Sequence, residues 1–279
     1  MHRTDWDQLT APVRAAIERR TGRVRTARTA PAGKNSAIAA VLGTDGGPVF
    51  VKGLRVEDPR VVSQEREAVV SRYVSALSPQ LLWHTEVDGW NLLGFRAAPG
   101  RHADYSPGSA DLPKVVDAMR RLALLWCPGL PQLKRAEQRW AAYADENDLH
   151  LLRGDTLLHT DYSPDNVLVD GGAARLVDWA WPTLGAGFID PSCLVVRLIF
   201  AGHTPEQAEA HVGAIPAWSD ATTRAIDTFS AILARMWTHI ADSDPNPWKR
   251  HMAESARSWE AHRHLRTSAS ALRPTAAPR

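Results

Sequence analysis

The sequence predicts an α+β protein with a strand-rich first third and a mainly helical remainder. Short apolar runs separated by turn residues occupy residues 24–95, and one helix-like segment lies among them. Ala97-Ala98-Pro99-Gly100 then interrupts the pattern. Beyond this break, apolar residues recur at helical spacing. We therefore expect a small, mostly antiparallel part followed by a larger helical part.

The N-terminal part is expected to contain two helices and five strands. Val13 and Ile17 have helical spacing, and Asp-Gly pairs at 45–46 and 88–89 are typical of turns between paired strands. The expected elements are a helix at 1–20, strands at 24–27, 38–42 and 48–54, a helix at 59–77, and strands at 81–83 and 92–95.

The C-terminal part is expected to contain helices around one short hairpin. Apolar residues share helix faces within 115–126, within 133–143 and within 226–240, and the last of these stripes is interpreted as core packing. Residues 265–279 are rich in Ser, Ala, Pro and Arg, which is typical of a mobile tail. The expected domains are therefore 1–96, 97–264 and the tail 265–279.

Composition indicates an ordinary globular protein and excludes several classes of function. The 279 residues suffice for one large domain or two small lobes that share a cleft. A formal net charge of +2 gives no sign of a surface for nucleic acid, and no apolar run approaches the roughly 20 residues that cross a membrane. The N-terminus lacks a signal-peptide pattern, and two cysteines are expected to be reduced, so we expect a cytoplasmic protein.

The most informative segment is LLHTDYSPDNVLVDGGAARLVDWAWP, residues 157–182. It holds His159, Asp161 and Asn166, then two apolar runs around a Gly-Gly turn, and then Asp178. A hairpin brings the start of its first strand and the end of its second to the same side. Asn166 and Asp178 are therefore expected to meet, with Asp161 on the preceding loop. One carboxylate that orients a hydroxyl, with an Asn and an Asp that hold magnesium, is the arrangement of a phosphoryl-transfer site.

These residues resemble the aminoglycoside phosphotransferase and choline kinase-like families, which are relatives of the protein kinases. Their catalytic loop is typically H-G-D-x-x-x-x-N, so Thr160 stands where Gly is commoner, and Val177-Asp178-Trp179 matches their metal-binding stretch. The resemblance covers roughly residues 20 to 262. It implies a two-lobed kinase-like fold, magnesium, and ATP or GTP held between the lobes, with the base against the backbone from Arg96 to Ala98.

Lys52 lies within an otherwise apolar strand and needs a partner, because burying an unpaired ammonium is costly. Its expected role is contact with the α- and β-phosphates of the nucleotide. Glu67 shares a helix face with Val70 and Val74 and is the expected acidic partner. Glu65, on a neighbouring face, is the alternative.

Three further residues are assigned supporting roles. The loop 32–36 lies where a phosphate-covering loop is expected, and Ser36 offers a hydroxyl there, although a plain hairpin loop is an equal interpretation. His159 resembles the family histidine that braces the catalytic loop. Asp190 precedes a Pro and is expected to cap a helix while also bracing that loop.

The predicted activity is transfer of a γ-phosphoryl group to a hydroxyl of a small molecule, with no nucleic acid or membrane as partner. The resemblance suggests an aminoglycoside or another antibiotic as acceptor, and a sugar or amino alcohol is the alternative. The candidate acids for a polycation are Glu206, Glu209, Asp242 and Asp244, although Glu206 and Glu209 occupy the first turn of an expected helix, where interaction with the helix dipole is the preferred interpretation. A nucleotide-binding pseudokinase is the rival from another class. A protein kinase is disfavoured because only about a dozen residues separate Asp178 from Asp190.

Overall fold

The computed structural model describes residues 3–31 and 35–271, and it divides into two compact units. We call them the N-terminal unit and the helical unit. The division follows contacts rather than chain order, because the segment 163–182 groups with the N-terminal residues. The N-terminal unit comprises residues 1–103, 124–133 and 163–182, and the helical unit comprises 104–123, 134–162 and 183–279. The predicted α+β class is confirmed, whereas the predicted domain boundary at 96/97 stays a prediction.

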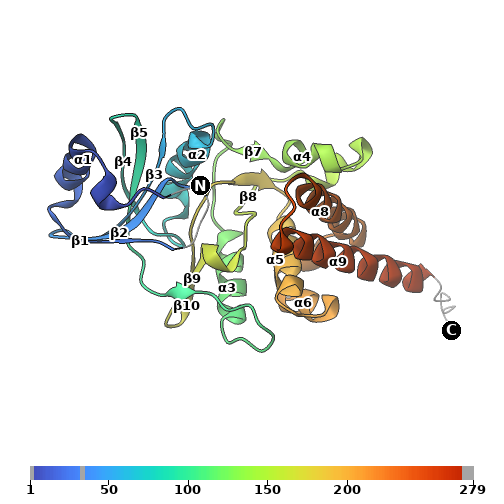
Figure 1. Ribbon diagram of the computed structural model, residues 1–279. Coiled ribbons are helices and arrows are strands. Elements are labelled where there is room, and N and C mark those ends of the chain that lie inside the picture. Colours follow the sequence, from blue (N-terminus) through green and yellow to red (C-terminus); the bar gives the residue numbers. More distant parts are fainter. Residues whose placement is uncertain (1–2, 32–34, 272–279) are drawn as a thin grey trace. The chain divides into compact units, whose positions relative to one another are not determined.

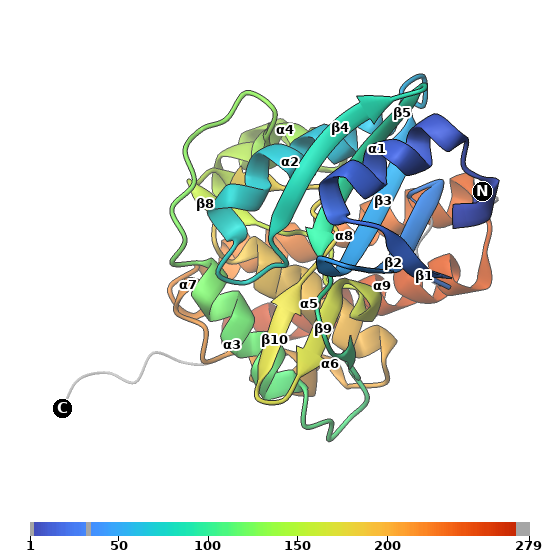
Figure 2. The same cartoon turned by 90° about the vertical axis from the view of Figure 1, so that its left-hand side faces the viewer.

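The N-terminal unit is built on an antiparallel five-stranded sheet with the order β1-β2-β3-β5-β4. Figures 1 and 2 show this sheet with the helices α1 and α2 of the same unit. The elements up to the interruption are η1 (Trp6–Gln8), α1 (Ala11–Thr21), β1 (Val24–Thr29), β2 (Ile38–Thr44), β3 (Gly47–Arg55), α2 (Val61–Val74), β4 (Leu81–Val87) and β5 (Trp90–Arg96).

Turn chemistry and core packing explain this sheet. The turn between β4 and β5 places Asp88 at φ 49° and Gly89 at φ 72°, the left-handed pair that an Asp-Gly hairpin adopts readily. On one face, α1 buries Val13 and Ile17 in a cluster with Leu42 of β2 and other strand residues. The expected five strands and two helices are therefore present, in the expected order. Local turn residues and short apolar runs indicated each of them.

A second, small sheet of this unit has the order β10-β9-β6 and carries the motif-bearing hairpin. Its strands are β6 (Arg101–His102), β9 (Val167–Asp170) and β10 (Ala173–Leu176), and the 3-10 turn η4 (Pro164–Asn166) leads into β9. β6 pairs with β9 directly after Gly100, which lies at φ +115°. A Cβ at Gly100 would lie 2.5 Å from the carbonyl oxygen of Val169. Because glycine has no Cβ, the chain segment after β5 can approach the backbone of this hairpin closely.

We expect Gly100→Ala to lower the free energy of unfolding by about 3 kcal/mol, because a left-handed conformation and a backbone clash act together. Gly108→Ala is the matched control. Gly108 also has positive φ, +83°, but a Cβ there would meet nothing within 4 Å. The control should therefore cost only about 1 kcal/mol. Urea unfolding of both variants measures the difference, and equal losses would contradict the close approach at Val169.

The helical unit contains seven α-helices, two 3-10 helices and one small sheet among its described residues. They are α3 (Leu112–Leu122), β7 (Lys134–Arg135), α4 (Ala136–Arg139), η2 (Ala141–Tyr143), η3 (Glu146–Leu152), β8 (Thr156–Leu158), β11 (Thr183–Gly185), α5 (Ile189–Phe200), α6 (Pro205–Val212), α7 (Pro216–Ser219), α8 (Thr223–Ser243) and α9 (Pro247–Ala271), with α4 and α7 a single turn each. β11 pairs parallel with β7 and antiparallel with β8. The antiparallel pair anchors the chain immediately before and after the motif segment.

The helix expected within 133–143 is wrong, because Lys134–Arg135 pairs with β11 and only a single α turn and a 3-10 turn follow. Of the predicted tail, residues 265–271 continue α9, and residues 272–279 lie outside the described part. The stripe within 226–240 is confirmed as a helix that buries Ile226, Phe229 and Leu233. In the described ranges, no helix combines the length and apolar character needed to cross a membrane.

Candidate functional site

The N-terminal unit brings Lys52 together with two carboxylates. The Lys52 Nζ lies 2.5 Å from Oε2 of Glu67 and 2.8 Å from Oδ1 of Asp178. The Lys52 and Glu67 side chains are only 7% and 5% exposed, whereas that of Asp178 is 29% exposed. The inward helix face of α2 thus supplies the partner, and Glu65 is exposed to solvent. One partly exposed carboxylate therefore lies beside a buried, paired cation.

Electrostatics keep this lysine charged. Burial alone would lower the pKa of Lys52, but the charges of Asp178 and Glu67 and their hydrogen bonds outweigh burial and raise it. Burial raises the pKa of Glu67, and the Lys52 charge opposes that effect. The backbone N–H of Trp179 also donates to Glu67, at 3.4 Å. A fixed ammonium of this kind is suited to contact with phosphate oxygens.

The β9–β10 hairpin brings Asn166 next to Asp178. The N–H of Val177 donates to the Asn166 carbonyl at 2.9 Å, so the residue before Asp178 is hydrogen-bonded to Asn166 itself. Asp178 adopts φ 61°, a left-handed conformation that Asp tolerates better than most residues. A carboxylate and an amide oxygen are hard oxygen donors, so these two residues fit Mg²⁺ by the chemistry of their donor atoms. The predicted ligand roles stay predictions.

The other predicted nucleotide contacts also lie in this unit. Ser36 is nearly buried directly before β2, and the next residue, Ala37, donates its N–H to Gly53 beside Lys52. Residues 32–34 of the expected phosphate loop lie outside the described part. Arg96 ends β5 with an exposed side chain, and Ala98 follows in the break. Their predicted contacts with phosphate and base stay predictions.

The helical unit holds the predicted catalytic loop through Asp190. The loop leaves β8 at His159, and the two oxygens of the Asp190 carboxylate accept the N–H groups of His159 and Thr160, each at 2.9 Å. Tyr162 donates its hydroxyl to the same carboxylate at 3.2 Å. Thr160 adopts φ 67°, which is unfavourable for a β-branched residue, so these bonds hold a strained turn.

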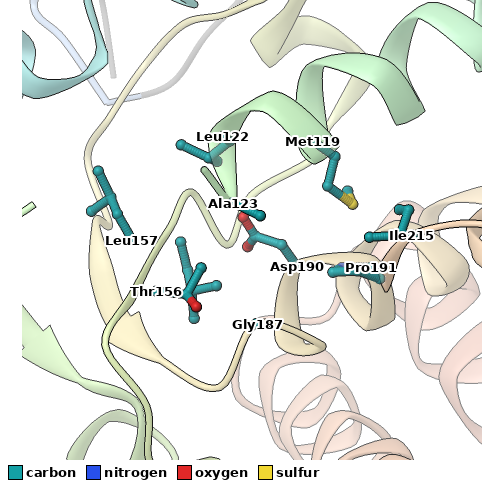
Figure 3. Close-up of a pocket in the computed structure, with 10 residues that line it drawn as sticks. Met119, Leu122, Ala123, Thr156, Leu157, Gly187, Asp190, Pro191 and Ile215 are labelled. Carbon is teal, nitrogen blue, oxygen red and sulfur yellow. The ribbon is translucent and has the colours of Figure 1, made fainter. Parts of the chain in front are cut away.

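Asp190 therefore braces the loop and does not cap a helix. The expected capping role is wrong, because α5 begins at Ile189, which puts Asp190 inside its first turn, where the carboxylate faces the loop. Burial raises the pKa of Asp190, and the two backbone N–H groups oppose that effect. Figure 3 shows Asp190 beside Met119 and Leu122 at a cavity of about 10 Å³. That space holds one water at most, so it serves packing and not ligand binding.

His159 and Asp161 are the other predicted residues of this loop. His159 is buried, and its Nδ1 accepts the N–H of Asp161 at 3.3 Å. Asp161 is partly exposed, and its Oδ1 lies 2.8 Å from Nη2 of Arg197. An oriented carboxylate on a braced loop is what a general base requires. Its predicted catalytic role stays a prediction.

Sequence reasoning missed several charged neighbours of these sites. Arg197 lies on α5, 36 residues beyond its partner Asp161. Arg139 donates to the hydroxyl oxygens of Thr160 and Thr183, at 2.7 and 2.9 Å. Arg3 donates to the Ala30 carbonyl at the end of β1. No motif marks these arginines, although each supplies a long basic side chain to a motif loop or strand end.

Comparisons by sequence give no relative: no family model matches the chain, and no curated protein matches it. Solved structures do match. A thermostable mutant of aminoglycoside phosphotransferase APH(4)-Ia has a TM-score of 0.63 at 16% identity, covering 90% of this chain and 98% of that one. An aminoglycoside phosphotransferase from Alicyclobacillus acidocaldarius has a TM-score of 0.63 at 11% identity, covering 95% and 99%. Choline kinase LicA from Streptococcus pneumoniae has a TM-score of 0.60 at 11% identity, covering 90% and 98%.

The matches cover nearly the whole of each chain, and their low identities carry an argument about fold alone. Solved forms of the thermostable APH(4)-Ia mutant include complexes with hygromycin B and either ADP or AMP-PNP. Those ligands belong to that protein. The resemblance drawn from the motif is thus confirmed at the level of architecture, and this chain has the kinase-like fold of the aminoglycoside phosphotransferases and choline kinases.

Proposed function

We propose that this protein is a small-molecule phosphotransferase that moves the γ-phosphoryl group of ATP or GTP to a hydroxyl. The observation that carries the proposal is the buried Lys52–Glu67 ion pair with Asp178 at its open side. A buried ammonium held by two acids, one of them partly exposed, is the arrangement that phosphate and magnesium require. The kinase-like fold supports the same reaction class.

In the proposed reaction, the acceptor oxygen forms a bond to the γ-phosphorus as the bond to the β–γ bridging oxygen breaks. ADP or GDP leaves, and the hydroxyl proton passes to Asp161. Lys52 holds the α- and β-phosphates, and Asn166 and Asp178 would hold magnesium. When bound, the metal supplies neutralisation of the phosphate charge. Positioning and charge neutralisation carry most of the rate, because little covalent chemistry is asked of the protein.

Asp178→Ala tests the proposed nucleotide site. We expect the variant to lose most of the magnesium-dependent part of ATP affinity, a roughly tenfold or greater effect, because it removes the one anionic ligand of the metal. Calorimetric titration of ATP, with magnesium and with a chelator, measures it. Asp165→Ala is the control, since Asp165 is an exposed acid of the same segment. If wild type and Asp178→Ala bind ATP equally well, both with magnesium and with the chelator, the proposed site is refuted.

The second candidate function is a nucleotide-binding regulatory module without transfer activity. Both proposals predict ATP binding, so transfer to an acceptor distinguishes them. The observation against the regulatory module is that Asp161 is braced by His159 and lies on a loop fixed by Asp190. Such bracing is required for catalysis and not for binding alone. A cytoplasmic location stays part of the proposal, and so does a role in antibiotic resistance if the acceptor is an antibiotic.

A further inference from the structure

The carboxylate proposed as the base is paired with a cation on its own unit. Nη2 of Arg197 lies 2.8 Å from Oδ1 of Asp161, and the two side chains are 14% and 32% exposed. The guanidinium is also placed by packing, with its Nη1 3.7 Å from the Met252 sulfur and its carbon 5.5 Å from the Trp237 ring centre. A guanidinium has five N–H donors, and these contacts use few of them. Arg197 therefore retains donors for a ligand beside Asp161.

Tyr105, in the same unit, is a second candidate donor. Its side chain is 2% exposed, and its hydroxyl is buried with no hydrogen-bond partner. Burial raises the pKa of Tyr105, and the charges of Arg197 and Asp161 both act on the phenol. Its carbonyl oxygen lies 2.9 Å from Nε2 of His203, which holds the backbone. Buried hydroxyls nearly always have a partner, so an oxygen of a bound ligand is a candidate partner for this one.

The acids that would serve a polycationic acceptor are occupied within the helical unit. Glu209 is buried and pairs with Arg263 and Arg266, and it also accepts the indole N–H of Trp259. Glu206 pairs with His262, and Asp244 pairs with Lys249. Glu209 and Asp244 therefore have cationic partners already, and Glu206 lies beside an imidazole. These contacts link α6 to α9 and the end of α8 to α9, and the buried carboxylate of Glu209 is closed to an amine.

Asp242, the fourth predicted acid, lines a cavity of about 360 Å³ formed by α8 and α9. Glu254 lines it as well, but so do Arg250 and Arg257. Two acids and two arginines leave the lining without net negative charge. A ligand with several amines gains little there, because each amine would meet an arginine as readily as a carboxylate.

We propose that the acceptor is a hydroxylated compound that is neutral or anionic next to its reacting hydroxyl, and that Arg197 and Tyr105 bind an oxygen of it. This inference rests on the proposed function and names its substrate class. The Arg197 guanidinium neutralises Asp161, so the pair offers no net negative charge to an ammonium group, whereas its remaining N–H donors attract a carboxylate or hydroxyl oxygen. Polycations and choline-like cations are thereby excluded as good acceptors.

The test is transfer of label from γ-labelled ATP to a panel of matched acceptors. The panel contains glycerol, D-glucose and myo-inositol as neutral compounds, D-glycerate and D-gluconate as anions, and choline, kanamycin and hygromycin B as cations. We expect the best neutral or anionic acceptor to exceed the best cation at least tenfold in kcat/KM. The inference would be overturned if a cation had a higher kcat/KM than every neutral and anionic acceptor. It would also be overturned if no neutral or anionic acceptor were phosphorylated.

Variants of the two donors show whether they bind the acceptor. Arg197→Met should raise the KM of the best acceptor at least tenfold. It should also reduce the ratio of kcat/KM between that acceptor and the best cation, while ATP affinity stays unchanged. Arg224→Met is the matched control, because Arg224 forms an ion pair of the same 2.8 Å length with Asp148 but is 70% exposed. If acceptor KM and preference respond alike in both variants, Arg197 does not recognise the acceptor.

Tyr105→Phe keeps the inference testable if Arg197→Met folds poorly. It removes only a hydroxyl that has no partner, so the unfolding midpoint should not fall. We expect the acceptor KM to rise about fivefold with ATP affinity unchanged, a split that a purely structural role would not produce. An unchanged KM would remove Tyr105 from the subsite. If the wild-type protein does not bind ATP in the presence of magnesium, the proposed function itself is refuted. Failure of the proposed function and failure of the acceptor subsite therefore give different results.

Discussion

Asp161→Asn is expected to lower the turnover of phosphoryl transfer by roughly 100-fold or more, the usual scale for loss of a positioned acid–base group. The amide keeps the shape of the side chain but cannot accept the hydroxyl proton. ATP affinity should stay within a few-fold, because Lys52, Glu67 and Asp178 are untouched. Steady-state kinetics with the best acceptor, and calorimetry with ATP, measure the two quantities.

Asp165→Asn is the control for this substitution. Asp165 lies four positions further along the same segment and is exposed. Its amide should leave turnover within about twofold, since surface substitutions away from special features have small effects. If Asp161→Asn retained the turnover of this control, Asp161 would not be the base.

Asp190→Ala is expected to lower the free energy of unfolding by about 3 kcal/mol, because it leaves three buried donors without an acceptor. These donors are the N–H groups of His159 and Thr160 and the hydroxyl of Tyr162. Without them, the left-handed conformation of Thr160 loses its support, so turnover should fall as well. Urea unfolding and kinetics together measure the loss.

Asp190→Asn separates the brace from the charge. The amide carries one acceptor oxygen and can still receive one of the two backbone N–H groups. Its loss of stability should therefore lie between those of the wild type and the alanine variant. An alanine variant as stable as the wild type would show that Asp190 does not hold the loop.

The N-terminal sheet could be predicted from the sequence because its signals are local. The Asp-Gly turn at Asp88 and the short apolar run that begins β4 are read from neighbouring residues. The segment 133–143 shows why other elements could not be predicted from the sequence. Its apolar spacing suits a helix, but Lys134–Arg135 pairs with β11, about 49 residues later in the chain. A pairing over that separation leaves no trace in local periodicity.

The site divides in the same way. The motif indicated Asp161, Asn166 and Asp178 because their spacing is fixed by one hairpin, and the helix face indicated Glu67 rather than Glu65. The direct contact between Lys52 and Asp178 spans 126 positions, and no pattern announced it. The pairing of Asp161 with Arg197 was equally hidden, because an arginine on an apolar helix fits a surface role just as well. Contacts made by tertiary packing must be read from coordinates.

Transfer of the γ-phosphoryl group itself tests the central claim most directly. Wild-type protein, Asp161→Asn and Asp178→Ala should each be incubated with γ-labelled ATP, magnesium and the acceptor panel, and the products separated. We expect labelled organic phosphate with the wild type. The rate of its formation should be lower by roughly 100-fold or more with Asp161→Asn. ATP binding without labelled organic phosphate for any acceptor, or equal labelling by all three proteins, would contradict phosphotransfer at this site.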